Sequence, residues 1–153
     1  MARTRISGPA GVKALAGKPL GTSEWKTMRY EDIKAFADAT GDQQWIHVDR
    51  ERCAKESPFG APIAHGYLSL ARIGGLFFEV LEFDGMKHIL NYGLNKVRFI
   101  SPVPVGSRLR GHYKLLAYEP IAGGAQLTME VSVELEGSAK PACVAESVSR
   151  RFV

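Results

Sequence analysis

The sequence predicts an α+β domain in which an antiparallel sheet wraps around one long buried helix. The apolar residues of segment 65–81 spread around all sides of a helix, which is typical of a helix that other structure covers. Residues 127–136 alternate strictly between apolar and polar side chains, the period of a strand with one buried face. Several such strands after a single buried helix indicate a sheet that curls around it.

Two further helices are expected before the buried one. In residues 30–40 the apolar side chains recur at i, i+3, i+4 and i+7, which places them on one helical face. Gly41 follows, where a glycine at the C-terminal end of a helix is expected. A shorter helix is expected over residues 49–56, with Asp49 as its N-cap.

The second half of the chain is expected to be sheet. Residues 108–115 alternate as residues 127–136 do, and Gly123-Gly124 between these two runs indicates a hairpin. Residues 87–100 and 142–153 supply two further candidate strands. The strands are long enough and close enough in sequence to form one antiparallel sheet.

The chain is expected to contain one domain. Its 153 residues can bury a sizeable core, and no internal repeat divides them. Residues 1–21 carry four glycines and two prolines in a polar setting. We therefore expect a loosely ordered arm over residues 1–16 and a single domain over residues 17–153.

Composition excludes several classes of function. Lys and Arg number 20 against 16 Asp and Glu, a mild excess without blocks of like charge, which suits a small anionic ligand and argues against nucleic-acid binding. Arg72 and Glu79 interrupt the apolar helix, so it falls short of the about 18 apolar residues of a membrane span. The N-terminus lacks the apolar run of a signal peptide, so a cytoplasmic location is expected.

No metal or redox cofactor is expected. Cys53 and Cys143 stand far apart without a CxxC motif or a His-rich metal spacing, so we interpret them as reduced packing residues. The sequence also lacks a glycine-rich phosphate-binding loop. Chemistry in this chain is therefore expected to rest on its own acidic, basic and backbone groups.

Asp42 and His47 form the first candidate site. On a continuous helix, residues five apart point about 140° away from each other. Gly41 indicates that the helix has ended, so the following segment can curl and bring both side chains to one point. A carboxylate and an imidazole that share a cavity can activate water. The alternative is that Asp42 is a turn residue and His47 a core residue.

Gly66 forms the second candidate site. It lies at the start of the buried helix, where the first amides have no intrahelical partner and the helix dipole adds partial positive charge. Because glycine has no Cβ, a ligand oxygen can approach its N–H closely and be stabilised as an oxyanion. Alternatively, Gly66 only permits a tight turn. For His65 we favour a structural role over a second catalytic one.

The two candidate sites together resemble a known motif. Residues 41–47 (GDQQWIH), followed by residues 64–66 (AHG), resemble the hydratase motif of MaoC-like (R)-specific enoyl-CoA hydratases, and are most similar to nodulation-protein-N-like dehydratases. Residues 97–106 (VRFISPVPVG) are similar to a strand-turn-strand segment of the same family. One departure is that Gln44-Trp45 stand where the commoner motif has Asn-Pro.

The resemblance implies a hot-dog fold, a homodimer and a hydro-lyase that acts on acyl-CoA thioesters without a cofactor other than the coenzyme A of its substrate. The reaction would be reversible syn hydration of trans-2-enoyl-CoA to (R)-3-hydroxyacyl-CoA. By the same resemblance, Asp42 and His47 activate the water and the Gly66 amide binds the thioester oxygen. Basic side chains of the strands are candidates for contacts with the CoA phosphates: Lys96, Arg98, Arg108, Arg110 and Lys114.

Two other functions remain open from the sequence. A hot-dog acyl-CoA thioesterase would share the fold and the ligand but would hydrolyse the thioester. A non-catalytic acyl-CoA-binding protein, or an inactive subunit of a hetero-oligomeric dehydratase, would keep the fold without the chemistry. The intact pair of Asp42 and His47 argues against the non-catalytic acyl-CoA-binding protein.

Overall fold

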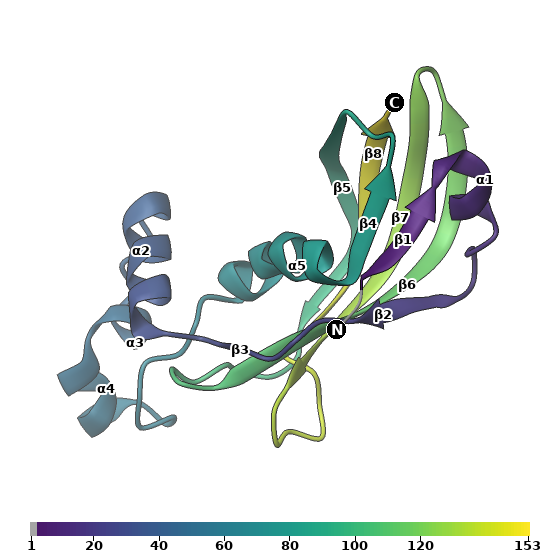
Figure 1. The fold of residues 1–153 in the computed structure, drawn as a ribbon. Coiled ribbons are helices and arrows are strands. Elements are labelled where there is room, and N and C mark those ends of the chain that lie inside the picture. Colours follow the sequence, from purple (N-terminus) through teal and green to yellow (C-terminus); the bar gives the residue numbers. More distant parts are fainter. Residues whose placement is uncertain (1–2) are drawn as a thin grey trace.

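The computed structural model describes residues 3–153 and has a curved antiparallel sheet with one long helix on its concave side (Figure 1). The sheet has six strands, of which five are paired in the order β2 (Pro19–Thr22), β6 (Arg108–Ile121), β7 (Gly124–Leu135), β8 (Cys143–Phe152) and β5 (His88–Phe99). The sixth, β3 (Lys26–Thr27), also pairs with β6. The α+β architecture predicted from the sequence is confirmed.

The long strands form where the alternating pattern predicted them. Leu109, Tyr113 and Leu115 of β6 are buried, and the polar residues between them face the other side of the sheet. The same holds for the apolar residues of β7, which include Leu127 and Val131. The two strands are joined at Gly123, whose φ of +75° is the left-handed conformation that a tight hairpin requires.

Helix α5 (Gly66–Val80) is the central helix, and it is buried on one side only. Leu68, Ile73 and Leu76 pack into the core against the sheet. The opposite side is exposed, and it carries Tyr67, Ala71, Gly74, Gly75 and Phe78. The expectation that the helix is covered all round is therefore wrong for this face of a single chain. An apolar composition predicts that a face will be covered, but does not say whether the same chain covers it.

The N-terminal arm is more ordered than we expected. From Thr4 onward it forms β1 (Thr4–Ser7) and α1 (Gly8–Lys13), and β1 pairs in parallel with β4 (Leu81–Asp84), which directly follows α5. Ile6 and Val12 belong to the hydrophobic core. The segment is too short to show a periodic pattern, and its partner strand is distant in sequence. Met1 and Ala2, which belong to the expected arm, lie outside the described residues.

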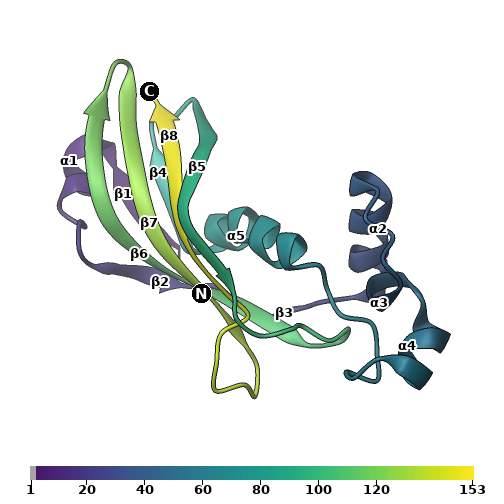
Figure 2. The ribbon, with the colours of Figure 1, turned by 180° about the vertical axis from the view of Figure 1, so that it is seen from behind.

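Three short helices lie together beyond the N-terminal end of α5 (Figure 2). They are α2 (Tyr30–Thr40), α3 (Trp45–Val48) and α4 (Arg50–Glu56). Helix α2 ends at Gly41, which has a φ of +79°, and the Asp49 carboxylate caps α4 by accepting a hydrogen bond from the Arg52 N–H at 2.9 Å. Both features were predicted. Within residues 3–153, no helix is long and apolar enough to span a membrane.

Candidate active site

Asp42 and His47 converge at the point where the three short helices meet the start of α5. Because α2 ends at Gly41, the chain leaves the helical path before Asp42 and returns as α3, which carries His47. One side-chain oxygen of Asp42 and ring nitrogens of His47 and His65 all lie within 4.8 Å of one another. The Asp42 side chain is 50% exposed, whereas His47 is only 7% exposed. The structure thus brings the predicted pair together.

The hydrogen bonding of His47 leaves one ring nitrogen free to accept a proton. Its Nδ1 lies 2.7 Å from the backbone oxygen of Ile63, and since a carbonyl can only accept, Nδ1 must carry the hydrogen. The Nε2 atom is then the unprotonated nitrogen of a neutral imidazole. Burial of the ring lowers the pKa of His47 below its ordinary value of 6.5, and the charge of His65 acts in the same direction. His47 is therefore suited to act as a base at neutral pH.

His65 connects the two members of the pair. Its Nε2–H donates a hydrogen bond to the backbone oxygen of Asp42 at 3.0 Å, and its ring stacks on the His47 ring with 3.8 Å between centroids. The ring of Phe36, on α2, also contacts the His65 ring, with 5.0 Å between centroids. These contacts support the structural role that we favoured for His65. The sequence offered no sign that it holds the Asp42 loop.

The geometry of this cluster does not favour a metal ion. A metal binds an imidazole nitrogen at about 2.0–2.1 Å, along a lone pair that lies in the ring plane. The His47 and His65 rings are stacked 3.8 Å apart with only 25° between their planes, so the two planes meet too far from the rings for one ion to bind both at that distance. The His65 Nε2–H is also engaged by the Asp42 carbonyl oxygen. The arrangement suits proton transfer better than metal coordination.

Gly66 is the first residue of α5 and directly follows His65, so it lies beside the pair. The His65 carbonyl oxygen accepts hydrogen bonds from the N–H groups of Leu68 and Ser69. Among the described residues, no acceptor lies on the N–H groups of Gly66 and Tyr67, and no side chain caps the helix. These free amides at the positive end of a helix dipole can bind the oxygen of a ligand.

A packing reason for glycine at position 66 was missed at the sequence level. A Cβ at this position would lie 2.9 Å from the ring of Phe99, the last residue of β5. The Phe99 ring also contacts the edge of Tyr67, with 5.7 Å between centroids. Gly66 therefore both leaves its amide open and lets an aromatic ring pack against the helix start. Phe99 lies in the segment 97–106 that resembles the family, but nothing in the sequence indicated that its ring would pack on Gly66.

Comparison with known proteins agrees with this geometry. A family model described as "MaoC like domain" matches residues 12–137. The chain belongs to the MaoC-like family. It is 52% identical over 142 residues to 3-hydroxyacyl-thioester dehydratase Z of Mycobacterium tuberculosis, covering 92% of this chain and 93% of that protein. It is 45% identical over 148 residues to nodulation protein N of Rhizobium leguminosarum, covering 92% and 88%.

The fold of this MaoC-like chain also matches a solved hydratase. The unliganded R-hydratase PhaJ1 from Pseudomonas aeruginosa superposes with a TM-score of 0.70 at 25% identity, covering 88% of this chain and 79% of that chain. A sheet wrapped around one helix in this strand order is the hot-dog fold. The family and the fold expected from the two motifs are therefore confirmed.

The two residues that depart from the commoner family motif lie at the start of α3. Gln44 precedes the helix and is exposed, and Trp45 is its first residue. The Trp45 ring packs under the guanidinium of Arg52, with 4.3 Å from the guanidinium carbon to the ring centroid. Trp45 therefore braces α3 against α4, and the larger residues do not prevent His47 from reaching the site.

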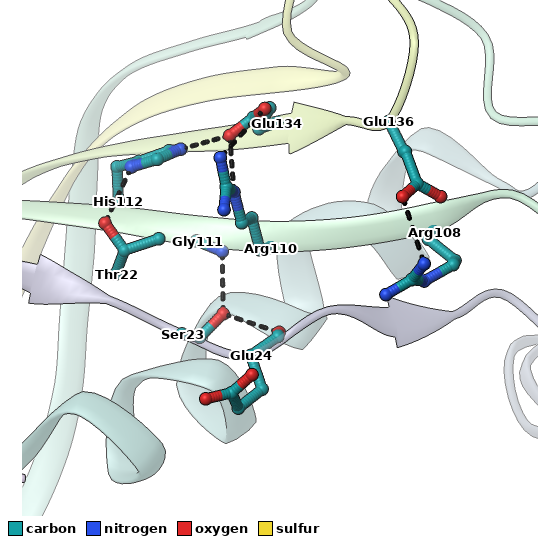
Figure 3. Close-up of polar contacts among 9 residues, drawn as sticks. All are labelled: Thr22, Ser23, Glu24, Arg108, Arg110, Gly111, His112, Glu134 and Glu136. Atoms are coloured by element: carbon teal, nitrogen blue, oxygen red, sulfur yellow. Dashed lines mark hydrogen bonds and ion pairs between the residues drawn. The ribbon is translucent and has the colours of Figure 1, made fainter. Parts of the chain in front are cut away.

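The basic residues of the MaoC-like sheet that were considered for CoA binding are largely paired. Arg108 binds Glu136 at 3.0 Å and Arg110 binds Glu134 at 2.6 Å (Figure 3). Glu134 also accepts from His112, so a polar network covers this outer face of β6 and β7. Because these residues alternate with the buried ones, they point away from α5. This agrees with a solvated strand face.

Proposed function

We propose that this chain is a hydro-lyase that reversibly hydrates trans-2-enoyl-CoA to (R)-3-hydroxyacyl-CoA. One observation carries the proposal: the Asp42 carboxylate and the unprotonated nitrogen of His47 lie together with His65, and the free amide of Gly66 directly follows His65 at the start of α5. A water activator and an oxyanion donor are the two groups that this reaction requires. Membership of a family whose named relatives include dehydratases supports the same chemistry.

In this mechanism the thioester oxygen accepts a hydrogen bond from the Gly66 N–H, and the dipole of α5 stabilises the negative charge that develops on it. Water is held between Asp42 and His47. His47 Nε2 accepts a proton from the water, and the resulting hydroxyl adds to C3 of the substrate. The pair then returns the proton to C2 on the same face. The chain's own residues complete this cycle without a metal or a redox cofactor.

The proposal is tested with purified protein and crotonyl-CoA. Loss of the conjugated enoyl absorbance is expected, because hydration removes the double bond. A thiol reagent, added with saturated butyryl-CoA in a parallel reaction, reports release of free CoA and so detects a thioesterase. Hydration without CoA release supports the proposal. CoA release without hydration indicates the thioesterase, and binding of either thioester without any turnover indicates the non-catalytic protein.

The pH dependence of the reaction should follow His47. Because burial lowers the pKa of His47 below 6.5, its neutral form persists to lower pH than that of an exposed histidine. We expect kcat/KM for crotonyl-CoA, measured from pH 8 down to about pH 5, to fall on the acid side with a midpoint below pH 6.5. Initial rates across this pH range give the midpoint of the acid limb. An acid limb with a midpoint above 6.5 would show that the base is not this buried imidazole.

The proposed functional unit is a homodimer. β5 is an edge strand of the sheet, and its large apolar residues Leu90, Tyr92 and Leu94 are exposed. The exposed face of α5, with Tyr67 and Phe78, adds to this apolar surface. An unprotected apolar edge is a site for strand pairing, and pairing with a second copy across a two-fold axis would cover it.

The dimer is tested by substitution at the edge. Light scattering of the wild-type protein should give twice the chain mass of 16.7 kDa at micromolar concentration. Leu90→Lys, at a side chain that is 52% exposed, should shift the protein toward the monomer because a charge must then be buried at the interface. The matched control is Thr128→Lys, which places the same charge on the interior strand β7. A wild-type protein that is monomeric at this concentration contradicts the proposal.

A further inference from the structure

Arg151 is a buried cation without an anionic partner. It lies on β8, is 2% exposed, and its Nε has no hydrogen-bond partner. The guanidinium contacts the rings of Phe77 and Phe83, with 4.7 and 4.1 Å from its carbon to the ring centroids. One of its terminal nitrogens lies 4.0 Å from the Met86 sulfur. No carboxylate within residues 3–153 pairs with it.

A buried charge without a partner lowers the stability of the folded protein, so its presence suggests a binding role. Buried charges in proteins are normally paired, because removal from water costs more than contacts with aromatic rings return. Burial lowers the pKa of Arg151 to about 10, so the side chain is still charged at neutral pH. The unpaired guanidinium can therefore bind an anion, and the ion pair would offset the cost of burying its charge.

Arg151 lines a cavity between α5 and the sheet. The cavity has a volume of about 430 Å³, within the range of small-molecule sites. Its walls are mainly apolar and include Leu70, Phe77 and Phe78 of α5 and Met129 of β7. Ser149, two residues before Arg151 on the same face of β8, also lines it. The Ser149 hydroxyl oxygen is also buried without a hydrogen-bond partner, so two neighbouring residues of the cavity wall each have an unsatisfied polar atom.

The cavity lies further along α5 from the candidate active site. Residues 66, 70, 74 and 77 follow the helical repeat and form one stripe, and the last three line the cavity. From Gly66 to Phe77 the helix advances about 16 Å, at 1.5 Å per residue. The Phe77 ring lies against the Arg151 guanidinium. A chain whose thioester oxygen is bound at Gly66 and which follows this stripe therefore ends at Arg151.

We propose that the cavity binds the acyl chain of the substrate and that Arg151, with Ser149, binds a carboxylate at the far end of that chain. The substrate class is then an extended ω-carboxyacyl thioester. This inference rests on the proposed hydratase function, because it places the thioester oxygen at Gly66. The guanidinium can donate two parallel hydrogen bonds to a carboxylate, and the Ser149 hydroxyl can donate a third.

The first test compares two long enoyl-CoA substrates of equal chain length, one ending in a carboxylate and the other in a methyl group. In the wild-type protein, the ratio of kcat/KM for the carboxylate to that for the methyl substrate should exceed one. Arg151→Met should lower this ratio at least about tenfold, because charge-assisted hydrogen bonds are lost. Ser149→Ala should lower it by less. The control Arg108→Met removes an exposed arginine from the outer face of the sheet and should leave the ratio unchanged.

The second test needs no turnover, so it separates this inference from the proposed reaction. Calorimetry measures the binding of saturated ω-carboxyacyl-CoA and of the matching acyl-CoA, neither of which can be hydrated. A preference for the carboxylate that is lost in Arg151→Met supports the site even if hydration is absent. Equal binding of the two ligands by the wild-type protein overturns it. An equal loss in Arg108→Met also overturns it, because surface charge would then explain the preference.

A third measurement distinguishes a ligand site from a structural role for Arg151. Because the cation is buried without a partner, replacing it with the apolar side chain of methionine should preserve or raise the melting temperature of the unliganded protein. Addition of the ω-carboxyacyl-CoA should raise the melting temperature of the wild-type protein more than that of Arg151→Met. A large drop in the melting temperature of Arg151→Met, with its ligand preference intact, would assign Arg151 to the core and contradict the proposal.

Discussion

Asp42→Asn and His47→Gln are each expected to reduce turnover of crotonyl-CoA by at least about a hundredfold. The asparagine keeps the shape of Asp42 but removes its charge, and the glutamine removes the His47 ring nitrogen that is free to accept a proton. Melting temperatures serve as the control for folding. Matched controls are Asp84→Asn, at a residue paired with Arg5, and His112→Gln, on the outer sheet face; neither should affect turnover.

The double variant tests whether the two residues act on one water. Residues that work as a unit are strongly non-additive, so Asp42→Asn combined with His47→Gln should be little slower than either single variant. If the double variant instead lost activity by the product of the two single losses, the two residues would act in separate steps. Near-normal turnover in a folded single variant would remove that residue from the mechanism.

Gly66→Pro is expected to have the second largest effect, a loss of about a hundredfold to a thousandfold in kcat. Proline removes the amide N–H and is otherwise tolerated in the first turn of a helix. It also adds a Cβ, which would lie 2.9 Å from the Phe99 ring. The matched control is therefore Gly66→Ala, which adds the same Cβ but retains the N–H.

The comparison between the two variants tests whether the ligand oxygen binds at the Gly66 amide. If the amide binds the thioester oxygen, Gly66→Ala should retain far more activity than Gly66→Pro at similar melting temperature. Phe99 must move in both variants, so its displacement cancels in the comparison. Equal losses in both would indicate that glycine is required only for packing under Phe99, and that another group binds the oxygen.

The sheet, the central helix and the convergence of Asp42 with His47 could be predicted because each depends on local pattern. Alternation in β6 and β7 reports a half-buried strand directly. Gly41 reports the end of α2, and this makes convergence of Asp42 and His47 geometrically possible. These patterns involve residues that are close in sequence, so they can be recognised without knowledge of the tertiary structure.

Other features depend on contacts between distant segments and left no local signal. Strand β1 pairs with β4, which lies nearly eighty residues later in the sequence, so the arm was expected to be only loosely ordered. The bond from His65 to the Asp42 carbonyl and the packing of Phe99 on Gly66 are likewise long-range. The burial of Arg151 is the clearest case, because arginine in an alternating strand suggests an exposed position.

The stereochemistry of the product tests the central claim most directly. The Gly66 amide and the Asp42–His47 pair hold the substrate at two points, so water can reach one face of the double bond only. Chiral analysis of the 3-hydroxybutyryl-CoA formed from crotonyl-CoA by the wild-type protein measures which face is used. The account predicts the (R) product alone. A racemic product, an (S) product or no hydration at all would contradict it.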